Sequence, residues 1–248
     1  MKVSVLILTF NEENHIEDCL KSVSWADEVI VVDSFSNDRT LKIIKEHNVK
    51  IVQEKWRGFS SQRNLGLEYC SNDWVLVVDA DERVTPELKK EIINRLEQAN
   101  DYNGYYIPRK TYFLGKWIKH CGWYPDHVLR LFRKSKGKYK ERMVHESVEL
   151  DGQAGYLSNC FIHYTYRDIE HFVDKMNSYS TLGAKEMFIK GKKVRLSDCM
   201  FRPSWALIKM YLLQRGYQDG IRGLIISVIS AFYVFLKYIK LWASYYSK

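Results

Sequence analysis

Two glycine-rich signatures of phosphate binding are missing from this sequence. No G-x-G-x-x-G motif follows the first predicted strand, and no G-x-x-x-x-G-K-[ST] motif occurs among the 248 residues. The first absence excludes the usual dinucleotide-binding loop, and the second excludes a P-loop. Neither of the two common phosphate-binding loops is therefore expected in this protein.

Paired cysteines and the pattern of a signal-peptide cleavage site are also missing. The five cysteines are widely spread, without a C-x-x-C pair or zinc-ligand spacing, so a cysteine zinc site and a disulfide framework are not expected. We expect reduced thiols that act as small buried hydrophobic groups. The apolar run Met1–Phe10 has no small-residue cleavage site after it, so we expect the domain to stay in the cytoplasm.

The excess of positive charge is confined to the C-terminal quarter. The formal net charge is +8, and residues 190–248 hold 11 Lys/Arg against 2 Asp/Glu, which leaves residues 1–189 close to neutral. A nucleic-acid-binding protein carries its basic residues on a polar face, whereas here they flank an apolar segment. We therefore expect no nucleic-acid partner.

No apolar run reaches the roughly 20 residues of a membrane-spanning helix. The run Leu224–Leu236 has 13 residues and is interrupted by two serines. Basic and aromatic residues surround it, a pattern typical of the membrane interface; they are Lys190, Lys192, Lys193, Arg195, Arg222, Lys237, Lys240, Trp242, Tyr245 and Tyr246. We predict a basic amphipathic helical tail on an anionic membrane surface. A buried C-terminal helix or a homo-oligomer contact is the alternative.

The first hundred residues alternate strand and helix patterns. Continuous β-branched and aliphatic runs predict buried strands, and apolar residues at helical spacing predict helices. The predicted order is strand Val3–Thr9, helix Asn11–Ser24, strand Glu28–Asp33, helix Thr40–His47, strand Lys50–Gln53, helix Gln62–Cys70, strand Trp74–Val78 and helix Glu87–Gln98. This order predicts an α/β fold with a mostly parallel sheet and flanking helices.

Polar residues follow three of these strands. They form the segments Thr9-Phe10-Asn11-Glu12, Asp33-Ser34 and Asp79-Ala80-Asp81. Ligands of such sheets bind beyond the carboxyl ends of the strands, so we expect the three segments to meet there. Two carboxylates that flank a small residue suit Mg²⁺ or Mn²⁺. The alternative for the third segment is an acidic turn before the helix that follows Thr85-Pro86.

The ordered motifs of residues 1–98 resemble the nucleotide-binding half of family 2 inverting glycosyltransferases, which have the GT-A fold. The motifs are VSVLILTFNEENHIEDCLKSV, DEVIVVDSFSNDRT and FSSQRNLGLEYCSNDWVLVVDADERVTPEL. The segment WYPDHVLRLFRK…ERMVHESV and the tail RGYQDGIRGLIISVISAFYVFLKYIKLW are similar to a narrower branch. That branch includes bacterial lipopolysaccharide-core β-1,4-glucosyltransferases. The resemblance implies a Rossmann-like sheet and a metal-dependent enzyme that uses a nucleotide-sugar.

The resemblance also implies a role for each matching residue. The implied donor-binding residues are Thr9, Asn11, Glu12, Asp33, Arg63, Asn64 and Asp79. Among them, Asp33 lies where the family hydrogen-bonds the uracil ring, and Arg63 matches the basic residue near the base and the phosphates. Asp79 would contact the ribose or the metal, and Asp81 would be the main ligand of Mg²⁺ or Mn²⁺.

An inverting transfer also needs a base that removes the proton of the attacking acceptor hydroxyl. The paired aspartates are engaged with the donor, so the base is expected in the second half. We favour Glu146, in Met143-Val144-His145-Glu146, because it occupies the place of an acidic family residue. Asp126 is the alternative, and the neighbouring Trp123 and Tyr124 are predicted to contact the acceptor sugar. Arg130 and Arg133 are predicted to face either a phosphate or solvent.

These features predict a donor-binding half over residues 1–100, an acceptor-binding and catalytic half over 101–188 and a helical tail over 189–248. The predicted function is transfer of a sugar, glucose by preference, from a UDP-sugar to a lipid-linked saccharide such as the lipopolysaccharide inner core. The enzyme would lie on the inner face of the cytoplasmic membrane. A polyprenyl-linked, capsular or protein acceptor is the alternative, and a non-catalytic nucleotide-sugar-binding module is the alternative from another class.

Overall fold

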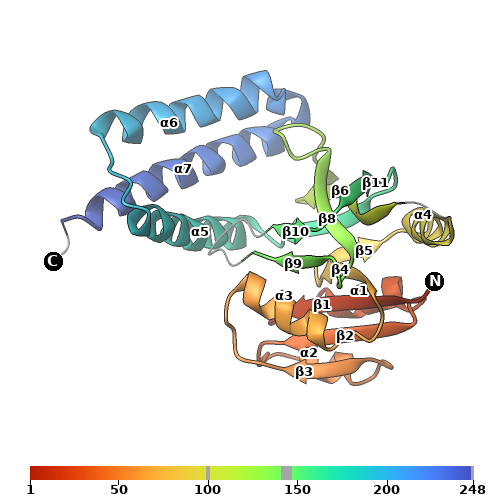
Figure 1. Cartoon of the computed structure of the whole chain (residues 1–248). Helices are drawn as coiled ribbons and strands as arrows, with labels where there is room; N and C mark the ends of the chain where they lie inside the picture. Colours follow the sequence, from red (N-terminus) through yellow and green to blue (C-terminus); the bar gives the residue numbers. More distant parts are fainter. Residues whose placement is uncertain (99–100, 141–146, 247–248) are drawn as a thin grey trace. The chain divides into compact units, whose positions relative to one another are not determined.

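The computed structural model describes residues 1–98, 101–140 and 147–246, which fall into two compact units. Unit 1 comprises Met1–Lys110 and Asp126–His163, and unit 2 comprises Thr111–Pro125 and Tyr164–Lys248. Figure 1 shows the course of the chain through both units. The strands β6 (Tyr102–Phe113) and β12 (Phe161–Tyr166) contribute residues to each of them.

The first part of unit 1 alternates strands and helices as predicted. The elements are β1 (Val3–Thr9), α1 (Ile16–Val23), β2 (Glu28–Asp33), α2 (Thr40–Ile44), β3 (Lys50–Gln53), α3 (Phe59–Glu68), β4 (Trp74–Asp79), β5 (Glu82–Val84) and α4 (Pro86–Glu97). The four strands β3, β2, β1 and β4 lie side by side in that order, and every pair among them is parallel. The prediction of a parallel α/β sheet is confirmed for this region.

The rest of the sheet is largely antiparallel. Strand β8 (Asp126–Arg133) lies between β4 and β6 and is antiparallel to both, and β12 is antiparallel to β5. Within the described residues the sheet has ten strands, with the path β3-β2-β1-β4-β8-β6-β12-β5 and with β7 (Lys116–Trp117) and β11 (Gln153–Tyr156) paired to β6. Two short strands, β9 (Gly137–Tyr139) and β10 (Val148–Leu150), form a separate antiparallel pair. The sheet is therefore mixed.

The alternation of side chains along β1 explains why that strand is apolar throughout. Val3, Val5 and Ile7 pack into one hydrophobic cluster with α1 and α4, whereas Leu6 packs into a second cluster with Leu67 of α3. Successive strand residues point to opposite faces, so a strand covered on both faces needs apolar residues at every position. Helices therefore cover both faces of the sheet at β1.

Helix α1 begins later than predicted because the preceding residues bind a loop instead of continuing the helix. Asn11 has a positive φ of 55°. Its backbone N–H donates to Ser36 Oγ at 2.9 Å, and its side-chain oxygen accepts from the N–H of Asn37 at 2.9 Å. The N–H of Glu12 donates to Thr40 Oγ1 at 2.8 Å. These bonds tie the end of β1 to the loop after β2 and to the first residue of α2.

Helices make up most of unit 2. They are α5 (Ile169–Ile189), α6 (Leu196–Ile208), the π-helical turn η1 (Lys209–Leu213), the 3₁₀ turn η2 (Gly216–Asp219) and α7 (Ile221–Ala243). Helix α7 packs against both α5 and α6, as Figure 1 shows. The buried Asp219 accepts from the backbone N–H groups of Lys119 at 3.4 Å and His120 at 2.8 Å, which joins residues 111–125 to the helices.

Helix α7 is longer than the predicted 13-residue run. It has 23 residues, and by length and composition alone it could cross a membrane. It continues past Lys237 and includes Lys240, which has partners on α5. The ammonium group of Lys240 donates to Ser180 Oγ at 2.7 Å and to Thr181 Oγ1 at 2.8 Å on α5. The complete helix therefore has the length that a membrane-spanning helix needs, which the 13-residue run alone lacks.

Candidate active site

The three polar segments predicted to meet at one sheet edge do so. Thr9 ends β1 and is paired in register with Asp33 at the end of β2, and Leu8 is paired with Asp79 at the end of β4. Thr9 and Asp33 are buried, and the Asp79 side chain is 27% exposed. The three polar side chains therefore stand at the carboxyl ends of neighbouring parallel strands, where ligands of such sheets bind.

The hydroxyl and carboxylate groups at the first two strand ends differ in how they are held. The Asp33 carboxylate accepts from the Ser36 N–H at 3.1 Å and from Gln53 Nε2 at 3.3 Å, which fixes its orientation. The buried hydroxyl of Thr9 has no hydrogen-bond partner within the described ranges. A buried hydroxyl without a partner is costly, so this group is suited to a ligand that completes its bonding.

Three other predicted donor-binding residues are hydrogen-bonded to neighbouring segments of the chain. Asn11 holds the loop after β2 through both its N–H and its side-chain oxygen. The Asn64 amide donates to the carbonyl of Tyr139 at 2.9 Å and accepts from its N–H at 2.9 Å, as a neighbouring strand would. The backbone N–H of Glu12 is bound by Thr40. In this structure the three residues shape the edge of the site.

Asp79 lies between two guanidinium groups. Arg63 Nη2 is 2.7 Å from Asp79 Oδ1, and Arg130 forms an ion pair with the other carboxylate oxygen. Arg63 is almost fully buried, and its guanidinium lies 5.2 Å from the ring centre of Tyr139. Burial by itself would raise the pKa of the Asp79 carboxyl, but the charges of Arg130 and Arg63 hold that pKa well below its usual range. Asp79 is therefore an ionised acceptor at any physiological pH.

The network of charged side chains continues from Asp79 to Asp126, the alternative candidate for the base. The fully buried Glu82 accepts from the Asp79 N–H at 3.0 Å, and its Oε1 lies 3.4 Å from Arg109 and 3.7 Å from Arg130. Arg109 Nε donates to Asp126 Oδ2 at 2.9 Å across the β6–β8 pair. The carboxylates of Asp79, Glu82 and Asp126 are thus linked through arginines, and each buried charge has a partner of opposite sign.

Asp81 lies beside a histidine that the sequence patterns did not single out. Asp81 Oδ2 is 3.4 Å from Nε2 of His163, and both side chains are largely buried. Two atoms that bind one ion at about 2.1 Å lie within about 4.2 Å of each other, so the separation fits a shared cation. Carboxylate oxygen and imidazole nitrogen are common metal ligands, and the nitrogen favours Mn²⁺ over Mg²⁺. Within the described ranges no third His, Cys, Asp or Glu joins the pair, so substrate oxygens would complete the coordination.

The predicted acceptor and base residues have different outcomes. Glu146 lies outside the described residues. Asp126 is at the start of β8, with its Oδ2 held by Arg109. The partly buried Trp123 packs against the aromatic core of unit 2, 6.2 Å from Phe113 between ring centres. Tyr124 is 37% exposed, so its ring is available to a ligand.

Four contributors to this site were missed or left open by the sequence patterns: Glu82, Arg109, Arg130 and His163. Arg130 had a usable signal, because it lies between leucines in a strand and a buried cation there requires carboxylates. In the structure it is only 7% exposed, so it does not face solvent. No spacing relates His163 to Asp81, because the two meet only through the antiparallel pairing of β12 with β5.

Known proteins and a family model match most of this chain. The model of Glycosyl transferase family 2 matches residues 4–163. The lipopolysaccharide core biosynthesis glycosyltransferase LpsC of Rhizobium meliloti is 28% identical over 98% of this chain and 92% of its own length. An uncharacterized glycosyltransferase of Rickettsia bellii is 32% identical over 97% of this chain and 86% of its own length.

A solved structure shares the fold. That of S. aureus TarS 1-349 in complex with UDP-GlcNAc superposes with a TM-score of 0.52 at 17% identity, over 97% of this chain and 92% of that one. The family match includes the three strand ends and the residue pair Asp81–His163. The chain therefore belongs to glycosyl transferase family 2 and is a glycosyltransferase.

Proposed function

We propose that this glycosyltransferase transfers a sugar, glucose by preference, from a UDP-sugar to a lipid-linked saccharide, with inversion and with a divalent cation. The observation that carries the proposal is the placement of Thr9, Asp33 and Asp79 at one sheet edge, next to Asp81 and His163. The TarS complexes with UDP-GlcNAc and UDP support a uridine nucleotide. The name of LpsC supports an acceptor of the lipopolysaccharide-core type.

Donor binding follows from the character of each group at the edge. The unpaired Thr9 hydroxyl and the oriented Asp33 carboxylate can bond the donor and acceptor groups of a uracil ring. The ionised Asp79 only accepts hydrogen bonds, so it suits the ribose hydroxyls. Arg63 is committed to Asp79 at 2.7 Å, so it acts by holding that carboxylate in place.

Asp81 and His163 would hold the cation, and their oxygen and nitrogen ligands fit Mn²⁺ or Mg²⁺. When bound there, the cation supplies positive charge that stabilises the departing diphosphate. The chain's own contribution is orientation, because Asp81 lies in the two-residue turn between β4 and β5, and His163 is held in β12 opposite Glu82.

The transfer itself forms one bond and breaks another. The acceptor oxygen forms a bond to the anomeric carbon, the bond from that carbon to the diphosphate oxygen breaks, and the hydroxyl proton passes to a carboxylate. We propose Glu146 for this base and Asp126 as the alternative. Arg109 binds Asp126 Oδ2, whereas Oδ1 has no partner within residues 1–98, 101–140 and 147–246, which keeps it available to a hydroxyl.

Two variants distinguish these bases. Glu146→Gln should abolish sugar transfer while leaving the affinity for UDP nearly unchanged, and Asp126→Asn should retain transfer. Transfer is measured as UDP release in the presence of acceptor, and UDP affinity by calorimetry. Full turnover by Glu146→Gln with loss in Asp126→Asn would move the base to Asp126.

The donor proposal is tested by thermal stabilisation. UDP-glucose with Mn²⁺ should raise the unfolding midpoint, and Asp81→Asn or His163→Gln should remove the Mn²⁺-dependent part of that rise. UDP without metal provides the matched control, because Thr9 and Asp33 remain intact in both variants. If no UDP-sugar stabilises the protein with either cation, the proposed donor is wrong.

We also propose that the tail holds the enzyme on the inner face of the cytoplasmic membrane. Helix α6 exposes large apolar side chains, with Leu196 at 79%, Met200 at 64%, Phe201 at 73% and Trp205 at 58% exposure. Contiguous exposed apolar side chains next to basic residues are typical of a membrane-facing surface. An acceptor with a lipid anchor would bring its saccharide to an enzyme held there.

Vesicle flotation of the full chain tests the membrane proposal. Replacing Leu196 and Met200 together by serine should reduce binding to phosphatidylglycerol-containing vesicles by more than about tenfold, since each buried apolar side chain contributes roughly 1.5–3 kcal/mol. Tyr156→Ser, at an exposed aromatic of unit 1, is the control. Equal flotation of wild type and the double variant would exclude the tail as the membrane contact.

A further inference from the structure

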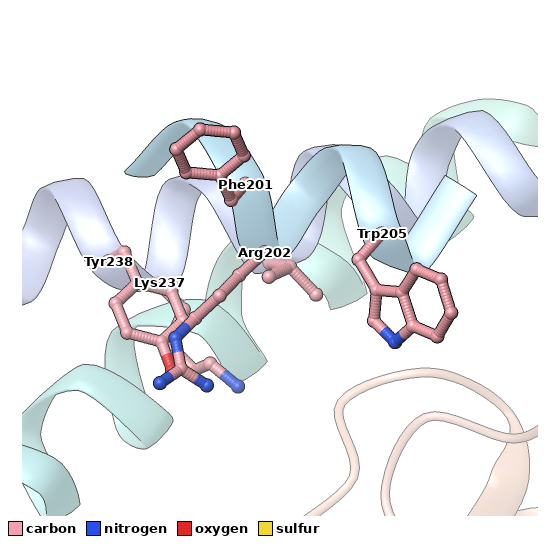
Figure 2. Close-up of a pocket in the computed structure, with 6 residues that line it drawn as sticks. Phe201, Arg202, Trp205, Lys237 and Tyr238 are labelled. Carbon is pink, nitrogen blue, oxygen red and sulfur yellow. The ribbon is translucent and has the colours of Figure 1, made fainter. Parts of the chain in front are cut away.

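A groove of about 410 Å³ lies between helices α6 and α7. We call it the α6–α7 groove; its lining residues are Phe201, Arg202, Trp205, Val234, Lys237 and Tyr238. Figure 2 shows the charged ends of Arg202 and Lys237 close to each other beside the ring of Tyr238. All six residues belong to unit 2, so the groove is formed within one compact body. It therefore combines two cations with aromatic and aliphatic walls.

Lys237 is the distinctive member of the groove. Its side chain is half-buried, and its ammonium group lies 5.1 Å from the ring centre of Tyr233 and 5.7 Å from that of Tyr238. Within the described part of the chain it forms no ion pair with a carboxylate. Burial, together with the charges of Arg202 and Lys192, lowers its pKa, so the nearby charges are of its own sign.

Arg202 adds a second positive charge, and its carboxylate partner is Asp198. Its Nε donates to Asp198 Oδ1 at 2.7 Å, one turn earlier on α6, and its guanidinium lies 5.2 Å from the Tyr238 ring centre. Asp198 therefore pairs with Arg202, and it forms no ion pair with Lys237 in the described part of the chain. Each cation–π contact stabilises a cation by about 0.5–1 kcal/mol at an exposed site. This is less than the cost of burying an ammonium group without an ionic partner. The groove consequently favours an anion.

The walls of the groove indicate what kind of anion it accommodates. Phe201 and Trp205 are 73% and 58% exposed, although both are large apolar side chains. A small hydrated ion would leave these surfaces in water. A ligand with a phosphate next to hydrocarbon would contact the cations and cover the aromatic rings at the same time. That combination of charge and apolar surface is found in a phospholipid at the membrane interface.

We propose that the α6–α7 groove binds the phosphate head group of an anionic phospholipid, with Lys237 and Arg202 at the phosphate and Phe201 and Trp205 against the acyl chains. This inference rests on the membrane association proposed above and adds a defined site to it. The site would orient the tail on the bilayer, because a bound head group fixes one face of the α6–α7 hairpin toward the lipid.

The test compares two lysines of the same tail in the full chain. Lys237→Gln removes the groove cation, and Lys193→Gln removes an exposed charge outside the groove. Vesicles of phosphatidylcholine with phosphatidylglycerol are the probe. A lysine that contributes only to the general attraction between the protein and an anionic membrane increases vesicle affinity about fivefold. Lys193→Gln should therefore reduce vesicle affinity by no more than about fivefold. Lys237→Gln should lose on the order of 20-fold, and Lys237→Arg should recover most of it.

Each outcome addresses a different claim. Equal losses in the two glutamine variants would overturn the groove site and leave general membrane attraction intact. Absence of flotation by the wild type would overturn the membrane proposal itself. Displacement from vesicles by inorganic phosphate, beyond the effect of chloride at equal ionic strength, would assign the groove to free phosphate. Far-UV circular dichroism and the unfolding midpoint confirm that each variant is folded.

Discussion

Replacement of Arg130 by methionine tests the charge network beneath the donor site. The Arg130 side chain is 7% exposed; it forms an ion pair with Asp79 and lies 3.7 Å from Glu82. Removing one partner of a buried ion pair costs about 3–5 kcal/mol because an uncompensated charge stays behind. Asp79 keeps Arg63 at 2.7 Å and Glu82 keeps Arg109 at 3.4 Å, so we expect the lower end, about 3 kcal/mol.

The same substitution should make stability depend on pH in a defined direction. The folded-state pKa of Asp79 is held below its ordinary value of about 3.9, so its ionisation stabilises the fold above that pH and the contribution is lost as pH falls through the folded pKa. Without Arg130 the folded pKa of Asp79 rises. The stability difference between wild type and variant should therefore be full at neutral pH and shrink below about pH 4.

Urea unfolding followed by circular dichroism at neutral and acidic pH measures both effects. Arg133→Met on the same strand is the matched control, because Arg133 pairs with Asp73 at 3.1 Å at the surface and such pairs contribute about 0–1 kcal/mol. A loss in Arg130→Met no larger than in Arg133→Met would refute the buried network. A difference that stays constant down to acidic pH would show that Asp79 is not the group involved.

Two glycines give further predictions about packing. Gly66→Ala would place a Cβ 2.4 Å from Leu6 Cδ1. Despite the better helix propensity of alanine, the variant should have a free energy of unfolding about 1–2 kcal/mol lower in urea titration. An unchanged midpoint would contradict the close α3–β1 contact. Gly223→Ala would place a Cβ 1.8 Å from the backbone oxygen of Gly216, which cannot move independently, so it should lower the thermal midpoint further, with a loss of about 3 kcal/mol. A smaller effect for Gly223 than for Gly66 would contradict this packing of η2 on α7.

Local patterns in the sequence were sufficient for the first part of the sheet. The apolar runs of β1, β2 and β4 are buried on both faces, and that requirement alone identifies them as strands. The rule that parallel strands share one carboxyl edge then places Thr9, Asp33 and Asp79 together, as observed. The prediction of unpaired, buried cysteines holds as well, since four of the five thiols are buried and burial raises the pKa of Cys70 to about 12.

The ends of the helices were less predictable. Helix α1 starts at Ile16 because Asn11 bonds the loop after β2, a contact between segments that no local pattern contains. Helix α7 extends past Lys237, and hydroxyl groups of α5 there accept hydrogen bonds from Lys240. In both cases a polar group forms a hydrogen bond with a segment that is distant in the sequence.

The segment Asp79-Ala80-Asp81 separates what the sequence determines from what the tertiary structure decides. The sequence by itself determined that these carboxylates follow a buried strand and stand beside Asp33. Only the tertiary structure placed Arg130 against Asp79 and His163 against Asp81, through the antiparallel pairing of β8 with β4 and of β12 with β5. Parallel edges follow from local periodicity, whereas antiparallel partners distant in the chain are chosen by how the whole sheet packs, which no short pattern encodes.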